Sequence, residues 1–385
     1  MPQPLPYWRL SSFYLFYFAC LGALLPFWGL YLRERGFGLT EIGSLMAILM
    51  ATKLVAPNVW GWIADRTHKR LAIIRLGSIL SALIFGLMYF DHGFVGMALV
   101  MAGFSFFWNA VMPQFEVLTL QHLGSQVTRY SRIRLWGSVG FVAAVVGLGW
   151  YFEHFPIQHL PWLVFSLYCM IAVSSFAVAS PAQSPGKVQG GLRLFLLEAR
   201  KPQTLLFFFV CFLMQISFGP YYTFFTIYLA DFGYSKSVIG WLWALGVIAE
   251  ILIFLIVHQL ISHLSWRSIA CGCFAITAAR WWVTGAYPDN GWIIVIAQLG
   301  HAASFGVFHA LAIHIVHKNF GSSTAGQGQA MYSALSFGAG GAIAAYLSGI
   351  LVESWGGSMA YFLAAGVAAL GGLLALALKT PAANG

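Results

Sequence analysis

The chain has 385 residues, of which 60% are hydrophobic and only 8% are charged, and its formal net charge is +9 at pH 7. A soluble protein cannot bury that much apolar surface, whereas a lipid bilayer accepts it. The basic residues lie in short segments between apolar runs and form no single block, so membrane topology explains them better than nucleic-acid binding.

Twelve apolar runs follow one another, each long enough to cross about 30 Å of hydrocarbon as a helix. The predicted spans are residues 8–32, 41–63, 71–90, 94–120, 133–152, 161–180, 204–230, 237–260, 267–286, 291–316, 327–351 and 358–378. The first run has no small-residue cleavage site and is expected to remain as a span. The predicted fold class is an all-α membrane protein with twelve transmembrane helices.

Loop charges predict the orientation of these helices. Most lysines and arginines lie in the loops after even-numbered spans and near the two chain ends, whereas most acids lie in the other loops. Because basic loops stay on the cytoplasmic side, both termini are expected in the cytoplasm.

The two halves of the chain repeat at an offset of 197 residues. Gly22 matches Gly219, Gly36 matches Gly233, and the run from Ile42 matches the run from Ile239. We therefore expect a six-helix bundle at residues 1–180, a cytoplasmic linker at 181–203 and a second six-helix bundle at 204–385. The linker is interpreted as a tether, within which residues 192–201 could form a short amphipathic helix. A duplicated six-helix unit is the layout of the major facilitator fold, whose substrate sites lie near the bilayer midplane.

The loop between the second and third spans carries a motif that resembles the major facilitator loop signature. It contains Gly61, Asp65, Arg66, Lys69 and Arg70. Asp65 is expected to cap the next helix and to pair with arginines, which would latch one conformation. His68 stands where the signature usually has a second glycine. The alternative is a basic loop with an incidental acid.

Lys53 and Glu250 occupy matching places in the second span of each half. A charge at the bilayer centre costs about 2.5–3.5 kcal/mol, so charged residues there usually serve function. Two interpretations remain open. The two charges could pair across the halves, or they could act separately, Lys53 for an anion and Glu250 for a proton.

Three further charges lie within or at the edge of predicted spans. Glu116 and Arg134 are on neighbouring antiparallel helices and could meet, either as a structural bridge or with Arg134 free to bind a substrate carboxylate through its planar fork. Arg280 lies on the ninth span, which is usually peripheral in this fold, and is interpreted as structural or snorkelling.

His301 and His309 lie on one face of the tenth span, eight residues apart with Phe305 between them. Histidine suits a proton relay, although a histidine in an apolar helix is often a packing residue. Aromatic residues are dense in the first, fourth and seventh spans. Most must pack or face lipid, but Trp28 and Tyr222 could contact substrate. The five cysteines lie in apolar runs, and neither they nor the histidines have spacing that indicates a metal site.

Several segments together resemble the phenylpropionate permease family of major facilitators, bacterial proton symporters related to galactoside permease. These segments are Gly22–Trp28, Arg134–Phe141, Gly240–Phe254, Arg280–Trp281, Gln298–His309 and Gln329–Tyr332. The resemblance implies uptake of an aromatic or related organic acid, driven by the proton gradient across the bacterial inner membrane. Glu116, Arg134, Glu250, His301 and His309 fall on the polar positions of the family pattern.

We therefore expect a proton-coupled permease that works by alternating access, with no cofactor besides the proton, no nucleic-acid partner and a monomeric state. Arg134 and Lys53 would bind the substrate carboxylate. Glu250 or Glu116 would carry the proton, helped by His301 and His309, because a buried carboxyl group can hold a proton at neutral pH. The alternative within this class is a sugar or nucleoside symporter. A membrane enzyme would need a nucleophile or a group of metal ligands, and the sequence shows neither pattern. A sensor with a transporter fold usually adds a soluble signalling domain.

Overall fold

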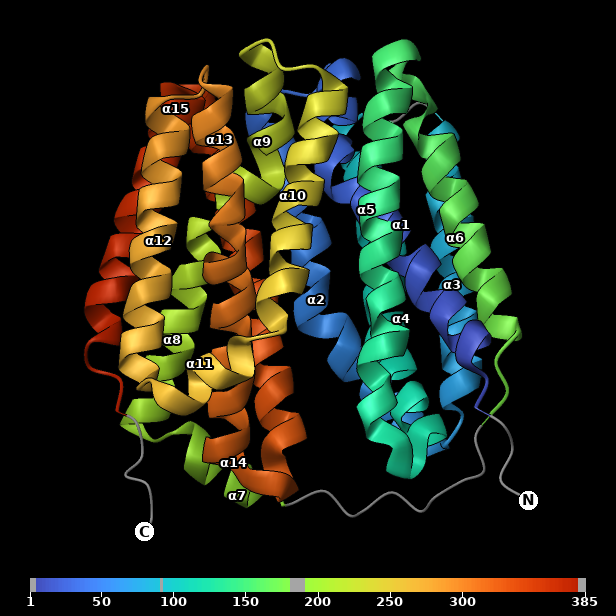
Figure 1. Ribbon diagram of the computed structural model, residues 1–385. Coiled ribbons are helices and arrows are strands. Elements are labelled where there is room, and N and C mark those ends of the chain that lie inside the picture. Colours follow the sequence, from blue (N-terminus) through green and yellow to red (C-terminus); the bar gives the residue numbers. More distant parts are fainter. Residues whose placement is uncertain (1–4, 91–92, 181–190, 380–385) are drawn as a thin grey trace. The chain divides into compact units, whose positions relative to one another are not determined.

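The computed structural model describes residues 5–90, 93–180 and 191–379, and every regular element in these ranges is helical (Figure 1). The prediction of an all-α chain is confirmed. Contacts divide the chain into two compact units, residues 1–186 with 235–241 and residues 187–234 with 242–385. Residues 181–190 of the predicted linker lie outside the described residues. The rest of the linker contains the short helix α7 (Leu192–Ala199), where an amphipathic helix was expected.

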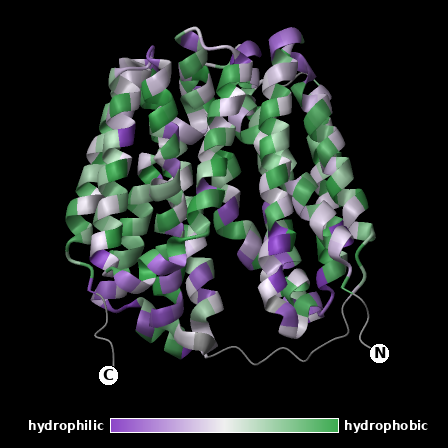
Figure 2. Cartoon of the chain, in the orientation of Figure 1, coloured by the Kyte–Doolittle hydropathy of each residue, from purple (hydrophilic) through white to green (hydrophobic). Residues whose placement is uncertain are grey.

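The first unit is built from six long helices. Their bounds are α1 (Tyr7–Glu34), α2 (Leu39–Thr67), α3 (Arg70–Phe85), α4 (Phe94–Leu123), α5 (Tyr130–His154) and α6 (Leu160–Phe176), with short 3₁₀ turns η1 (Gly86–Tyr89), η2 (Gly124–Arg129) and η3 (Ile157–His159). Helix α1 packs on α5 and α6, and α4 packs on α2 and α3. Hydrophobic residues predominate along these helices, as the hydropathy colours show (Figure 2).

Besides α7, the described part of the second unit contains eight helices of very different lengths. They are α8 (Pro202–Ser217), α9 (Gly219–Asp231), α10 (Lys236–Phe254), α11 (Val257–His263), α12 (Trp266–Ala286), α13 (Gly291–Leu299), α14 (Phe308–Ser333) and α15 (Gly341–Ala375), with π-helical segments η4 (Ala302–Val307) and η5 (Ala334–Gly340). Helix α15 packs on α12, α8 and α9, and η4 packs on α12. The first turns of α10 belong to the first unit.

Among the described residues, ten helices are long and apolar enough to span a membrane. Helix α12 is not one of the ten, and the helical stretch Ser323–Ala375 is 53 residues long, with a break at Gly356, where φ is 82°. The predicted span 237–260 is too long, since α10 ends at Phe254 and α11 starts at Val257. The polar residues after Val257 end the apolar run at this point.

The repeat is visible in the turn that follows the first span of each half. Gly36 and Gly233 both have left-handed φ values, 88° and 82°. After each glycine the next amide bonds five residues back, from Phe37 to Leu32 O at 3.2 Å and from Tyr234 to Leu229 O at 3.1 Å. Glycine takes this conformation without steric cost, so both helices end in the same capping motif.

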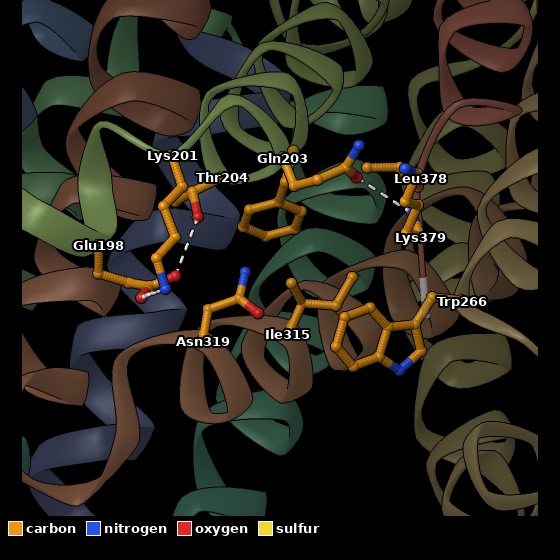
Figure 3. Close-up of a pocket in the computed structure, with 10 residues that line it drawn as sticks. Glu198, Lys201, Gln203, Thr204, Trp266, Ile315, Asn319, Leu378 and Lys379 are labelled. Carbon is orange, nitrogen blue, oxygen red and sulfur yellow. Dashed lines mark hydrogen bonds and ion pairs between the residues drawn. The ribbon is translucent and has the colours of Figure 1, made fainter. Parts of the chain in front are cut away.

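The end of the described chain is tied to the start of α8 within the second unit. The Gln203 side chain donates to Ala377 O at 3.3 Å and accepts from the Lys379 amide at 3.1 Å. Gln203 lines a cavity at this end of the unit, whose floor includes Trp266 and Ile315 and whose wall carries the Glu198–Lys201 ion pair (Figure 3). This cavity lies among α7, α8, α12, α14 and the Leu378–Lys379 segment.

Candidate functional site

Arg70 links three helices at the loop that was predicted to be a latch. Its guanidinium donates to Asp65 Oδ1 at 2.5 Å and to Gln114 Oε1 on α4 at 2.6 Å. Gly61 lies one helical turn before Asp65, and a Cβ there would stand 3.4 Å from Gln114 Nε2. The loop thus joins α2, α3 and α4 within the first unit. Its role as a conformational latch stays a prediction.

The remaining residues of this motif are at the surface. Arg66 lies over the Trp62 ring at 5.4 Å, and Lys69 is the exposed residue before α3. His68 ends α2 with φ 55° and ψ 19°, and no other non-glycine residue in the described ranges has a positive φ. The turn therefore has the backbone that a glycine would give, although a histidine occupies it.

Glu116 and Arg134 share one cluster in the first unit. Tyr130 donates to Glu116 Oε1 at 3.1 Å, and the Tyr130 ring meets the Tyr14 ring edge-on at 6.5 Å. The Arg134 guanidinium lies over Tyr14 at 5.9 Å and over Phe18 at 3.8 Å. In the described part of the chain the two charges form no direct salt bridge. Arg134 therefore has donors left for a ligand.

Space for the Arg134 guanidinium comes from a glycine one turn along α5. A Cβ at Gly137 would lie 2.7 Å from Arg134 Nη1. The small residue at this place thus makes room for the charged group.

Lys53 is half-buried on α2 and follows Thr52, which belongs to a group of polar side chains. Asn109 of α4 donates to Thr52 Oγ1 at 2.8 Å, and Thr52 donates to Ser105 Oγ at 3.0 Å. Lys53 belongs to the first unit and Glu250 to the second, and their pairing stays a prediction. Trp28 is fully buried and donates to Met101 Sδ at 3.5 Å, so this packing would have to open before the indole could touch a substrate.

Arg280 lies at the centre of a buried polar network in the second unit and is only 3% exposed. Its Nη1 donates to Ser304 Oγ at 3.0 Å and to His301 Nδ1 at 3.2 Å, and its Nη2 donates to Gln298 Oε1 at 3.1 Å. Tyr221 donates to the same Gln298 oxygen at 3.1 Å. Arg280 was interpreted as structural or snorkelling, and its burial shows that the snorkelling alternative is wrong.

Aromatic rings complete the surroundings of the guanidinium. It lies 4.3 Å from the Trp281 ring centroid and 4.5 Å from that of Tyr221. A buried charge needs compensation, and here neutral acceptors and ring faces supply it, since Arg280 forms no ion pair with any described residue.

His301 stands between Arg280 and Glu250. Its Nε2 is 3.8 Å from Glu250 Oε2, while its Nδ1 faces Arg280. Glycines lie beside both side chains, and the one at Gly306 is required for the close approach. A Cβ at Gly246 would be 3.4 Å from the His301 ring, and a Cβ at Gly306 would be 3.2 Å from Glu250 Cγ. An acid, a histidine and an arginine from three elements thus form a row inside apolar helices.

His309 lies eight residues, about two helical turns, further along the same face but belongs to a second polar pair. Phe305 is stacked between the two imidazoles, with ring distances of 5.3 Å to His301 and 5.7 Å to His309. His309 Nδ1 hydrogen-bonds to the Tyr332 hydroxyl at 3.0 Å. A simple proton relay between the two histidines would require direct contact. They are separated by Phe305 and so do not form such a relay.

The π-helical segments η4 and η5 face each other across a small cavity. Ser304 and Phe305 of η4, Ser336 and Phe337 of η5, and His309 line it. Segments with this wider hydrogen bonding are frequent at functional sites. Ser336 Oγ is buried and has no hydrogen-bond partner among the described residues.

Tyr222 lies in an aromatic group on α9. Its ring stacks on Phe218 at 5.2 Å and on Trp243 at 6.3 Å. Tyr222 is half-buried, whereas Trp28 is fully enclosed. Contact of either residue with substrate remains a prediction.

Sequence reasoning missed the central place of Arg280 and the parts played by Ser304 and Tyr221. The usable signal was an arginine in the middle of an apolar run, because such a charge must find buried partners. Ser304 and Tyr221 carry no comparable signal, since serine and tyrosine are common in membrane helices.

Comparison with known proteins gives a consistent set of relatives. The sequence model of the MFS_1 like family matches residues 7–364. A protein of Escherichia coli (strain K12) described as a probable 3-phenylpropionic acid transporter is 30% identical over 353 residues, covering 89% of this chain and 90% of the relative. A maltose permease of Geobacillus stearothermophilus is 27% identical, covering 89% and 87%.

Solved structures show the same fold at lower sequence identity. The crystal structure of the nucleoside transporter NupG superposes with a TM-score of 0.84 at 17% identity, covering 97% of this chain and 98% of that chain. The similarity supports the fold and leaves the substrate open, because the relatives are described with an aromatic acid, a sugar and a nucleoside.

Proposed function

The chain belongs to the MFS_1 like family of major facilitator transporters, and on this basis we propose that it imports a small organic acid by proton symport. The family consists of multi-pass membrane transporters and not of enzymes. The proposed substrate is an aromatic acid such as 3-phenylpropionate. The alternative is a sugar or nucleoside symporter.

We propose twelve membrane crossings in two six-helix halves. Ten crossings are the apolar helices already described. The eleventh is α12, whose 21 residues reach across about 30 Å. The twelfth follows from dividing Ser323–Ala375 at Gly356. The loop charges favour cytoplasmic termini in a bacterial inner membrane, and fusions that report the side of each terminus test this placement.

The row of Glu250, His301 and Arg280 is the observation that carries proton coupling. A carboxylate inside apolar helices is expensive, and a transporter that must bind and release a proton requires such a group. Glu250 is within 3.8 Å of His301, which is held by Arg280. We therefore place the transported proton in the second unit, with Glu250 as its main carrier. Glu116 beside Tyr130 is the other candidate.

The positively charged groups of the first unit support an anionic substrate. Arg134 has a planar fork suited to a carboxylate and lies over Phe18, and Lys53 is a half-buried amine on α2. In this proposal the substrate anion binds to Arg134 and Lys53, and Phe18 offers an aromatic face beside the Arg134 guanidinium.

The test uses purified protein in proteoliposomes with an imposed pH gradient. We expect Glu250→Gln to abolish accumulation of labelled 3-phenylpropionate and to retain exchange of internal for external substrate, because the proton site is lost and the anion site remains. Glu34→Gln changes an exposed acid at the end of α1 and serves as the matched control.

The substrate is checked in the same vesicles by competition with unlabelled 3-phenylpropionate, maltose and uridine. Competition by maltose or uridine alone would support the alternative symporter. Full accumulation by Glu250→Gln would remove Glu250 from the coupling site.

A further inference from the structure

One side of the His301 ring faces a donor that never loses its proton. Arg280 Nη1 lies 3.2 Å from His301 Nδ1 and 3.0 Å from Ser304 Oγ. An arginine guanidinium has only donors and stays charged in proteins. The two hydrogens of Nη1 therefore serve these two acceptors, and His301 Nδ1 must offer its lone pair.

This requirement fixes where the imidazole carries its hydrogen. A neutral histidine has one N–H, and with Nδ1 as the acceptor that N–H is on Nε2. Nε2 is the atom 3.8 Å from Glu250 Oε2. A second proton on Nδ1 would point at Arg280 and place a second positive charge beside it, in a site where His301 is 5% exposed and Arg280 is 3% exposed.

The surroundings hold both partners in place. Gln298 and the faces of Tyr221 and Trp281 fix the guanidinium. The charged and titratable side chains around the His301 ring are Glu250 of α10, Arg280 of α12 and Tyr221 of α9, whose hydroxyl is engaged by Gln298. Between α8 and α9 the described ring neighbour of His301 is the apolar Phe218.

We propose that Arg280 is a positioning residue that locks His301 in the Nε2–H tautomer, as a permanently neutral donor directed at Glu250. The second part of the inference rests on the proposed function. The transported proton then binds to a Glu250 carboxylate oxygen and leaves from it. His301 keeps its Nε2–H whether Glu250 is protonated or not, and directs that N–H toward a Glu250 oxygen that can accept it.

The tautomer is measured by ¹⁵N NMR on the full chain with labelled histidine in lipid nanodiscs. The His301 signals are assigned as those lost in His301→Gln. We expect an unprotonated Nδ1 and a protonated Nε2 across about pH 5 to 8, the range in which an ordinary histidine titrates. A protonated Nδ1, or a doubly protonated ring near the lower limit, would overturn the proposal.

Variants of Arg280 test the cause. Arg280→Met removes every donor, and we expect mixed tautomers and a titration of His301 within that pH range. Arg280→Lys retains a charged donor and should keep the single tautomer. Arg75→Met is the matched control, because Arg75 binds the carbonyls of Ser175 and Val178 in the first unit and its loss should leave the His301 signals unchanged. If Arg280→Met does not fold, the wild-type spectrum and Arg280→Lys still decide the question.

Transport by a His301 variant tests the site of the proton separately. We expect uptake by His301→Gln to be about tenfold slower but still driven by the pH gradient. Uptake by Glu250→Gln should no longer respond to the pH gradient. Loss of the drive in His301→Gln with exchange intact would place the proton on His301 and contradict the inference. If wild-type transport does not depend on the pH gradient while the spectra show a single His301 tautomer, the proposed proton symport is wrong. The effect of Arg280 on the tautomer would still be supported.

Discussion

His68 shows how one residue can carry backbone strain inside an otherwise regular motif. It ends α2 with φ 55°, a region that costs a non-glycine residue about 1–2 kcal/mol. The related loop signature usually has a glycine at this place, and the backbone keeps the shape that a glycine favours. The histidine is therefore tolerated by the turn rather than required for it.

We expect His68→Gly to stabilise the protein by about 0.5–1 kcal/mol and to raise the apparent Tm by about 1–2 °C, because the left-handed conformation costs glycine nothing. Thermal unfolding followed by tryptophan fluorescence measures the shift. Thr67→Gly, one residue earlier within α2, should lower the Tm, since glycine is unfavourable inside a helix. A lower Tm for His68→Gly would mean that the histidine side chain contributes contacts that outweigh the strain.

Close helix contact in the first unit depends on where glycines lie along α5. A Cβ at Gly140 would be 2.1 Å from Leu15 O, a backbone atom of α1 that cannot turn aside. Gly147 is on the same helix and has no such neighbour within 4 Å. Small residues allow membrane helices to approach closely at some positions, whereas at other positions they have no effect on helix packing.

We expect Gly140→Ala to cost about 1–3 kcal/mol and to lower the apparent Tm by several degrees, because α1 and α5 must separate. The matched variant Gly147→Ala should leave the Tm unchanged or raise it slightly, since alanine favours the helix. Unfolding of the two purified variants side by side is the measurement. Equal Tm values would show that the α1–α5 contact adjusts without cost.

The kinds of elements were predictable and some of their ends were not. Apolar length predicted helices correctly, because a backbone in lipid must satisfy its own hydrogen bonds. The break of α10 at Phe254 and the π-helical segments η4 and η5 were not predicted. They depend on packing between helices, which periodicity along one helix does not report.

At the scale of the whole molecule, the two halves share a turn but differ in chemistry. Gly36 and Gly233 end their helices in the same way, whereas Lys53 and Glu250 give the two halves opposite charges at equivalent positions. Lys53 lies on α2 of the first unit, while Glu250 belongs to the row with His301 in the second unit. Because Glu250 has His301 as a neighbour within its own unit, we favour two separate roles over a permanent pair.

We expect the double variant Lys53→Glu with Glu250→Lys not to restore accumulation, because each charge serves a different ligand. Lys53→Gln should raise the KM for the substrate anion, and Glu250→Gln should remove the proton drive. The exchange Asp65→Arg with Arg70→Asp is the control, since these two groups are in contact and the swap should recover stability relative to the single variants. Recovery of accumulation by the Lys53/Glu250 swap would instead support a pair.

The sequence by itself determined an all-helical membrane chain of the major facilitator type, its internal repeat, and the charges that lipid would make expensive. Each of these follows from residue type and order along the chain, through apolar length and loop charge. Only the tertiary structure decided that Arg280 is the centre of the polar network, between Gln298, Ser304 and His301, with Glu250 beyond. The sequence shows where a charged residue lies along its own helix. The partners of that residue depend on which faces of the other helices pack against it.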